Sequence, residues 1–248
     1  MEHVGSHPSR PGRLAVVAGH SVLGRGFGPL ARTARAVTVG PPEGALTCLD
    51  AGPVVFLQRH GDPYRAPHRI DHHANLAALA DLGCDRVLAL GSVGSLRTDL
   101  TPGMVVVPDD YLALHGGATS RHDDHAGHGI HGFTPAWRAE VRDAWAARAP
   151  VPAVDGGTYW QTNGPRFETP AEIRLLATFA DVVGMTVASE VVAASEAGLA
   201  YAAVCIVDNL ANGIGTDRLT LEAFEAGKAR NHSMLLATLD AVVADLTA

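Results

Sequence analysis

Short apolar runs recur along the chain, separated by segments with polar positions and helix punctuation. The runs predict strands at Leu14–Ala18, Val54–Gln58, Arg86–Leu90, Met104–Pro108, Val182–Met185 and Tyr201–Val207. Because the runs are continuously apolar, they are typical of strands that helices cover on both faces of a sheet.

The segments between these runs carry helix start and stop signals. The first expected helix is Ile70–Leu82, which stops at Gly83, and the second begins at Thr134-Pro135. A third begins with the capping-box spacing Thr169-Pro170-Ala171-Glu172. The last runs from near Thr220 to about Leu246. The alternation predicts an α/β fold in which a central mixed β-sheet is flanked by helices. We expect a disordered N-terminal arm over residues 1–12 and a single domain over residues 13–248.

Composition and charge limit the kinds of molecule that the protein can bind and the compartment in which it is expected. The formal net charge of −7 argues against a nucleic-acid surface, because phosphate backbones need clustered Lys and Arg. No apolar run approaches the roughly 20 residues that span a bilayer, and the first residues contain no apolar signal segment. Three widely spaced cysteines without a CxxC pattern suit a reducing compartment, so we expect a cytoplasmic protein.

Polar and small residues follow several of the predicted strands. They are Gly19-His20-Ser21, Arg59-His60, Gly91-Ser92, Met185-Thr186 and Asp208-Asn209. Ligands in α/β sheets collect at the carboxyl ends of strands. A glycine turn can present backbone N–H groups to an anion, and the Arg fork matches phosphate oxygens. A tight turn without a ligand explains the first feature equally well. A surface Arg-His pair is the alternative for the second, but its position at a strand end favours a functional role.

The order and spacing of longer motifs carry more information. The pieces are Arg59-His60-Gly61; Pro67-His68-Arg69-Ile70-Asp71-His72-His73-Ala74-Asn75-Leu76; Gly94-Ser95-Leu96 followed by Pro102-Gly103-Met104-Val105-Val106; Gly164-Pro165-Arg166-Phe167-Glu168-Thr169; Gly184-Met185-Thr186; Ser189-Glu190-Val191-Val192; and Glu196-Ala197-Gly198. With these pieces the chain resembles the trimeric purine nucleoside phosphorylase and methylthioadenosine phosphorylase family over roughly Leu14 to Leu246.

The resemblance implies a phosphate site and a sugar contact. The phosphate-binding positions of the family fall on His20, Ser21, Arg59, His60, Ser92 and Thr186, and Met185 takes the place of the methionine that lies against the ribose. The family usually has Thr or Ser where this chain has His20. If neither His20 nor Ser21 serves phosphate, water could replace phosphate, and the protein would be a nucleoside hydrolase.

The resemblance also bears on the base. Asn209, Ala211 and Glu168 form the pattern of members that take 6-oxopurines, and Phe167 could cover the purine ring. An Asn side chain can donate to O6 while accepting from a protonated N7, and the Glu168 carboxylate can accept from N1–H. Asp208 competes with Asn209 for this role. If the register slipped by one residue, the preference could move toward 6-aminopurines.

The sequence therefore predicts a purine nucleoside phosphorylase that cleaves inosine-type or guanosine-type nucleosides. Asn209, Glu168 and His60 are the predicted catalytic residues, phosphate is the co-substrate, and neither a metal nor an organic cofactor is expected. A methylthioinosine or methylthioadenosine phosphorylase is the alternative. The histidine that contacts the 5′-hydroxyl in the family has no secure counterpart in this chain, and the resemblance puts Thr220 or a neighbouring residue near its position. A non-catalytic nucleoside-binding protein is the further alternative.

Residues 115–131 form a long loop rich in Gly, His and Asp. Loops of this length in compact domains are usually functional or mobile. His122, Asp123, Asp124, His125, His128 and His131 offer nitrogen and oxygen donors that could bind a divalent metal. In the resembled family this region reaches the active site of a neighbouring subunit. The resemblance therefore implies a homotrimer in which the loop contacts a neighbouring subunit, as the alternative to a metal site.

Overall fold

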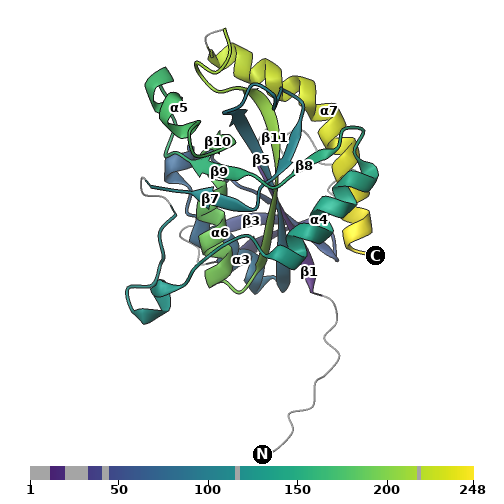
Figure 1. Cartoon of the computed structure of the whole chain (residues 1–248). Coiled ribbons are helices and arrows are strands. Elements are labelled where there is room, and N and C mark those ends of the chain that lie inside the picture. Colours follow the sequence, from purple (N-terminus) through teal and green to yellow (C-terminus); the bar gives the residue numbers. More distant parts are fainter. Residues whose placement is uncertain (1–11, 20–32, 41–44, 115–117, 217–218) are drawn as a thin grey trace, which may run out of the picture.

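The computed structural model describes residues 12–19, 33–40, 45–114, 118–216 and 219–248. Within these residues the predicted α/β architecture is confirmed: a single mixed sheet runs through the molecule, and helices pack on it (Figure 1). Residues 1–11, which hold most of the predicted disordered arm, lie outside the described residues, so the domain boundary stays a prediction.

The centre of the sheet consists of its most apolar strands. β1 (Arg13–Ala18) pairs in parallel with β4 (Val54–Gln58) on one side and with β5 (Cys84–Ser95) on the other. β11 (Ala200–Leu210) runs parallel to β5 along its other edge. β10 (Val182–Gly184) pairs antiparallel with the end of β5, which makes the sheet mixed.

The outer strands are short, and the apolar pattern did not predict them. They are β2 (Arg35–Val39), β3 (Leu46–Asp50), β7 (Asp110–Leu112), β8 (Ala153–Asp155) and β9 (Thr158–Gln161). β6 (Val105–Val107) is shorter than the predicted Met104–Pro108, whereas β5 and β11 extend well beyond their apolar cores. Pairing with neighbouring strands, and not local sequence, sets these lengths.

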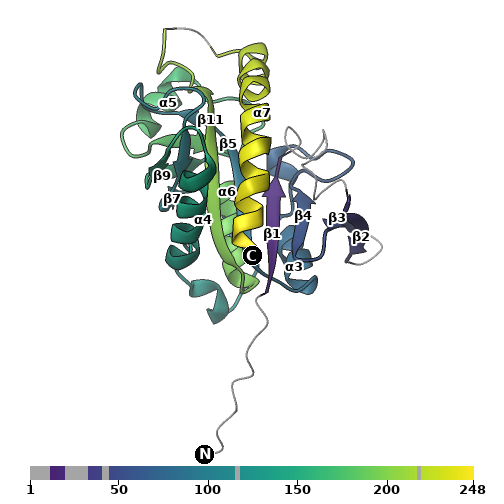
Figure 2. The same ribbon diagram turned by 90° about the vertical axis from the view of Figure 1, so that its right-hand side faces the viewer.

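Two helices cover each face of the sheet. α3 (His72–Asp81) and α6 (Val187–Glu196) pack on one face, and α4 (Pro135–Arg148) and α7 (Leu221–Leu246) pack on the other (Figure 2). Eight of the ten residues of α6 are buried, so it has no polar stripe, and the sequence pattern did not predict it.

The remaining helical segments are short. α5 (Pro170–Leu176) begins with the predicted capping box of Thr169 and Glu172. Thr134 is the N-cap of α4 as predicted, but its hydroxyl accepts a hydrogen bond from the backbone of Tyr201 and does not cap the helix. Two 3₁₀ turns, η1 (Pro67–Arg69) and η2 (His125–His128), lie before α3 and in the long loop before α4.

Candidate active site

A gap between strands opens beside the middle of β5. β1 pairs with β5 as far as Ala89, and β10 pairs with it only from Gly94, so on this edge residues 90–93 are left between the two partners. Gly19 follows β1, Arg59 and His60 follow β4, and Met185 and Thr186 follow β10. A cavity of about 340 Å³ occupies the place where they meet.

The cavity gathers the predicted residues from distant parts of the chain. Its lining includes Arg59, His60, Ser92, Phe167, Glu168, Met185, Thr186 and Asn209, together with Gly19 of the first glycine turn. His20 and Ser21, predicted to bind phosphate, lie outside the described residues. Strand ends bring these residues together because neighbouring strands of the sheet terminate beside one another.

Arg59 is not a free cation at the edge of this cavity. Its guanidinium is buried and forms a two-point ion pair with the Glu190 carboxylate, with Nε–Oε1 at 2.5 Å and Nη2–Oε2 at 3.0 Å. Nη1 also donates to the Leu90 carbonyl at 2.9 Å. Burial by itself would lower the pKa of Arg59, but the Glu190 charge outweighs it and raises that pKa. The three bonds fix the fork in place.

Glu190 is the anchor of this arrangement, and the sequence assigned it no role. Its carboxylate is fully buried and also accepts from the Tyr201 hydroxyl at 2.6 Å. Burial acts to raise the pKa of Glu190, yet the Arg59 charge and hydrogen bonds lower it overall. The one available signal was a carboxylate inside the apolar run Val187–Ala194, because a buried charge needs a partner.

His72 lies against the same carboxylate. Its Nδ1 is 3.8 Å from Glu190 Oε1, and it has no hydrogen-bond partner among the described residues. Burial lowers the pKa of His72 to about 4, although the Glu190 charge opposes this shift. His72 is therefore neutral at pH 7.

His60 lines the same cavity, and its ring has a defined orientation. Its Nδ1 lies 2.8 Å from the Arg65 carbonyl, its ring stacks on Tyr64 at 4.8 Å, and Nε2 is on the side of Gly19. A carbonyl can only accept, so Nδ1 carries the hydrogen. A neutral His60 therefore presents an acceptor at Nε2, and only a protonated ring would donate there to an anion.

Thr186 stands at the start of α6, where helix N–H groups favour negative charge. Thr186 is the N-cap residue, but its side chain makes no capping bond and lines the cavity. The Tyr159 hydroxyl instead accepts from the backbone N–H groups of Thr186 and Val187 at 3.2 and 3.4 Å. The Thr186 hydroxyl therefore remains at the cavity wall.

Phe167, Glu168 and Asn209, the predicted base-binding residues, also line the cavity. The Phe167 ring lies 5.3 Å from that of Phe224 at an angle of 67°. Glu168 is buried, and its Oε1 accepts from the Thr162 hydroxyl at 2.5 Å. Asn209 Nδ2 donates to the Leu210 carbonyl at 2.8 Å, and no bond within the described part of the chain uses its Oδ1.

Met185 also lines the cavity, and a glycine makes room for it. Gly164 adopts a positive φ of 61°, and a Cβ at this position would lie 2.3 Å from Met185 Sδ. Any other residue would be strained in this conformation and would displace the thioether. The predicted sugar contact thus depends on the loop that also positions Phe167 and Glu168.

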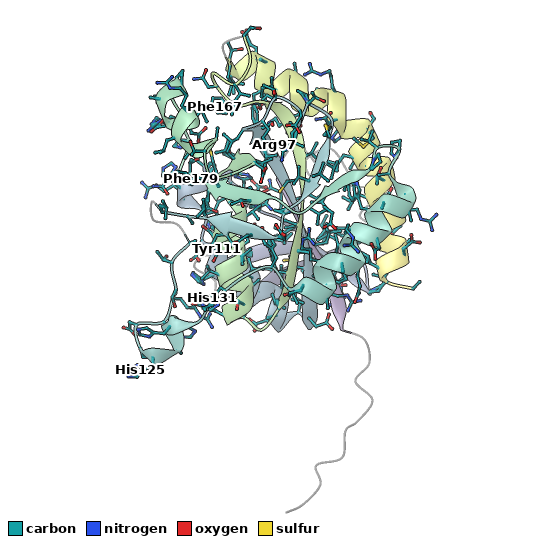
Figure 3. The ribbon with its side chains drawn as sticks, in the orientation of Figure 1. Arg97, Tyr111, His125, His131, Phe167 and Phe179 are labelled. Atoms are coloured by element: carbon teal, nitrogen blue, oxygen red, sulfur yellow. The ribbon has the colours of Figure 1, made fainter. Side chains whose placement is uncertain are left out.

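The long histidine loop lies away from this cavity. Figure 3 shows His125 at the tip of the loop, at the opposite end of the molecule from Phe167. The loop is tied to α6 where Arg121 N–H donates to Glu196 at 3.2 Å and His131 Nδ1 lies 2.8 Å from the Ser195 hydroxyl. Across the described ranges, no group of three or more His, Cys, Asp or Glu side chains is arranged to hold a metal ion.

Comparison with known proteins identifies similar chains. A sequence profile described as the phosphorylase superfamily matches residues 13–244. A protein of Archaeoglobus fulgidus named "Probable 6-oxopurine nucleoside phosphorylase" is 42% identical over 67% of this chain and 68% of its own length. A namesake from Thermococcus kodakarensis is 34% identical over 93% of this chain and 91% of its length.

Two further comparisons extend this picture. A protein of Methanothermobacter thermautotrophicus named "Probable S-methyl-5'-thioinosine phosphorylase" is 37% identical over 83% of this chain and 73% of its length. The solved structure of methylthioadenosine phosphorylase from Schistosoma mansoni in complex with adenine is similar with a TM-score of 0.78. It is 26% identical and covers 95% of this chain and 92% of its own.

Proposed function

Because the chain belongs to the phosphorylase superfamily, we propose that it is a purine nucleoside phosphorylase acting on 6-oxopurine nucleosides. It transfers the pentose from the base to phosphate, which yields free base and pentose 1-phosphate. One observation carries the proposal: Asn209 and Glu168 line the same cavity as Arg59, His60 and Thr186. Met185 also lines this cavity.

The geometry supports a division of labour between these two groups of residues. When the glycosidic bond lengthens, the sugar gains positive charge and the base gains negative charge. Asn209 holds the base edge on which this charge collects, and phosphate attacks the anomeric carbon from the opposite face. Catalysis in such a site comes from positioning and from donors aimed at developing charge, so we expect no metal or organic cofactor.

The 6-oxopurine preference rests on the hydrogen-bond roles of two side chains. When it is ionised, Glu168 accepts hydrogen bonds but cannot donate them, which suits the N1–H of a 6-oxopurine. Adenine would set an unprotonated N1 against this carboxylate and leave a buried acceptor unpaired, at a cost of about 1–3 kcal/mol. The names of the Archaeoglobus and Thermococcus relatives agree with this preference.

Phosphate dependence is the decisive test. Inosine should be cleaved only when phosphate is present, and the product should be a sugar 1-phosphate. Thr186→Val keeps the side-chain shape but removes the hydroxyl, so KM for phosphate should rise about tenfold or more, while KM for inosine changes little. Thr178→Val, an exposed position on α5's C-terminal side, is the matched control. Equal cleavage without phosphate, giving free sugar, would make the protein a hydrolase.

A 5′-methylthio nucleoside is the second candidate substrate, and one observation favours it. The Thr220 hydroxyl, near the expected 5′ position, caps α7 by accepting from Ala223 N–H at 3.1 Å. The cavity wall beside it consists of Leu219, Leu221 and Phe224, which are apolar. The name of the Methanothermobacter relative agrees with this candidate. The ratio of kcat/KM for inosine and methylthioinosine decides between the two.

We further infer that the enzyme is a homotrimer and that it is located in the cytoplasm. The loop over residues 118–131 lies far from the cavity of its own chain and exposes Ile130 fully, which favours a role at a neighbouring copy. The three cysteines are buried and unpaired, as suits a reducing compartment. None of the described helices is long and apolar enough to cross a membrane. A fully active monomer in light scattering would contradict the trimer.

A further inference from the structure

Thr162 lies directly after β9 and contacts the predicted base carboxylate. Its hydroxyl donates to Glu168 Oε1 at 2.5 Å. The Gly184 carbonyl of β10 lies 3.5 Å from the same hydroxyl, a longer and weaker contact for its one hydrogen. This carbonyl also accepts the Thr162 backbone N–H at 2.9 Å, so the pairing of β9 with β10 holds the threonine in place. The sequence assigned Thr162 no role.

The main chain around Glu168 is held as well. Asn212 Nδ2, beyond the end of β11, donates to the Glu168 carbonyl at 3.0 Å. The next residue, Thr169, caps α5 through its capping box with Glu172. Arg166, the cation of the same loop, is engaged by both Glu172 oxygens at 2.7 and 2.8 Å. Glu168 therefore has a fixed backbone, and within the described part of the chain its carboxylate accepts from a hydroxyl alone.

The two carboxylate oxygens of Glu168 are unequal. The residue is only 8% exposed, and Oε1 is occupied by the Thr162 hydrogen. Oε2 accepts no bond from the residues that the structure describes, and it is not among the buried polar atoms that lack a partner. It is therefore open to the cavity that Glu168 lines. A base in this cavity meets one free oxygen and one that already accepts a hydrogen bond.

The 6-oxopurine bases differ at the edge that would face this carboxylate. Hypoxanthine offers one strong donor, N1–H, beside a hydrogen on carbon C2. Guanine offers two parallel donors, N1–H and a 2-amino N–H, which match the two oxygens of a carboxylate as the fork of an arginine does. Hypoxanthine needs only the free oxygen, whereas guanine needs both.

We propose that Thr162 makes the base site selective for hypoxanthine nucleosides over guanine nucleosides by occupying one oxygen of Glu168. The inference rests on the proposed phosphorolysis of 6-oxopurine nucleosides and specifies which of them is preferred. A carboxylate oxygen has two lone pairs, so Oε1 can still accept a second, weaker bond, and the result is a preference and not an exclusion. Thr162 is outside the cavity lining, so it acts through Glu168 as a positioning residue.

Thr162→Val is the direct test, because Val keeps the shape and removes the hydroxyl. In the wild type, kcat/KM for inosine should exceed that for guanosine about tenfold, the effect of one weakened hydrogen bond. In the variant both Glu168 oxygens are free, so this ratio should fall to about twofold or less, while KM for phosphate stays within about twofold of wild type. Thr162→Ser keeps the hydroxyl and should keep the wild-type ratio.

Inhibition by the free bases gives an independent readout that needs no variant. Hypoxanthine and guanine compete with inosine and carry no sugar, so the ratio of their inhibition constants reports recognition of the base edge. For the wild type, hypoxanthine should bind about tenfold more tightly than guanine. Thr178→Val is the matched control, because Thr178 is exposed and its hydroxyl donates to the Arg174 carbonyl of α5, and it should change neither ratio.

Three results would overturn the inference. The first is a wild-type enzyme that uses guanosine as well as inosine or better. The second is a Thr162→Val enzyme with the wild-type ratio. The third is a Thr162→Ser enzyme that loses the preference as the Val variant does, which indicates a packing role for the side chain. Failure of the proposed function is recognised separately, because the wild-type protein would then cleave neither nucleoside in a phosphate-dependent manner.

Discussion

Replacing Glu190 with Gln should expose how much the fold depends on one buried ion pair. The side chain of Arg59 is 3% exposed and that of Glu190 is fully buried, so water cannot solvate either charge. Gln has almost the same shape, but one of its two oxygens becomes an NH₂ group that faces the Arg59 fork. The guanidinium would then be a buried cation without a counter-charge.

The size of the effect follows from that geometry. Removing one partner of a buried pair typically costs about 3–5 kcal/mol in unfolding free energy. Glu190 also accepts from Tyr201, which places the estimate at the upper half of this range. For a chain of this length, about 2–4 °C of melting temperature corresponds to each kcal/mol, so the melting temperature should fall by roughly 8–20 °C.

Urea unfolding at pH 7 in phosphate-free buffer is the assay. Asp245→Asn is the matched control. It breaks the exposed ion pair with Arg148 and should leave the urea concentration at the unfolding midpoint unchanged. Phosphate should stabilise Glu190→Gln more than wild type, because the uncompensated Arg59 gains an anionic partner. A Glu190→Gln protein within about 1 kcal/mol of wild type would refute the reasoning, since breaking a buried pair cannot cost so little.

Two further outcomes follow from the site. Asn209→Asp should lower kcat/KM for inosine by roughly 10²-fold or more, about 2.7 kcal/mol, because two acceptors then face each other, while activity on adenosine holds or rises. Adding Glu168→Ser should shift the preference further, and an unchanged inosine-to-adenosine ratio in steady-state assays would contradict the assigned register. For His72, the folded-state pKa of about 4 lies below the ordinary value of 6.5, so its contribution to stability is complete above pH 6.5 and is lost as pH falls through 4. Urea unfolding at pH 7 and pH 4 should show a loss of at most about 3 kcal/mol from this group, which His72→Gln should abolish.

The sequence by itself determined the class of fold and identified several of the residues that line the cavity. Continuously apolar runs identified the central strands because those strands are buried on both faces, and the residues directly after them had to meet at strand ends. Together with the family resemblance, this allowed Arg59, Thr186 and Asn209 to be assigned to one site before any contact was known. Helix caps at Thr169 and Thr220 were equally readable, because capping depends on neighbours within four residues.

Only the tertiary structure decided how those residues are held. The partner of Arg59 is 131 positions away, on a helix without a polar stripe, so no local pattern could pair them. The gap beside β5 exists because β1 and the antiparallel β10 approach it from opposite directions and stop pairing at Ala89 and Gly94, which is a matter of strand register. A β-bulge of β11 at Asp208, between Val207 and Asn209, has the same origin: a one-residue mismatch between two paired strands determines on which side a carboxyl lies, and pairing is a long-range property.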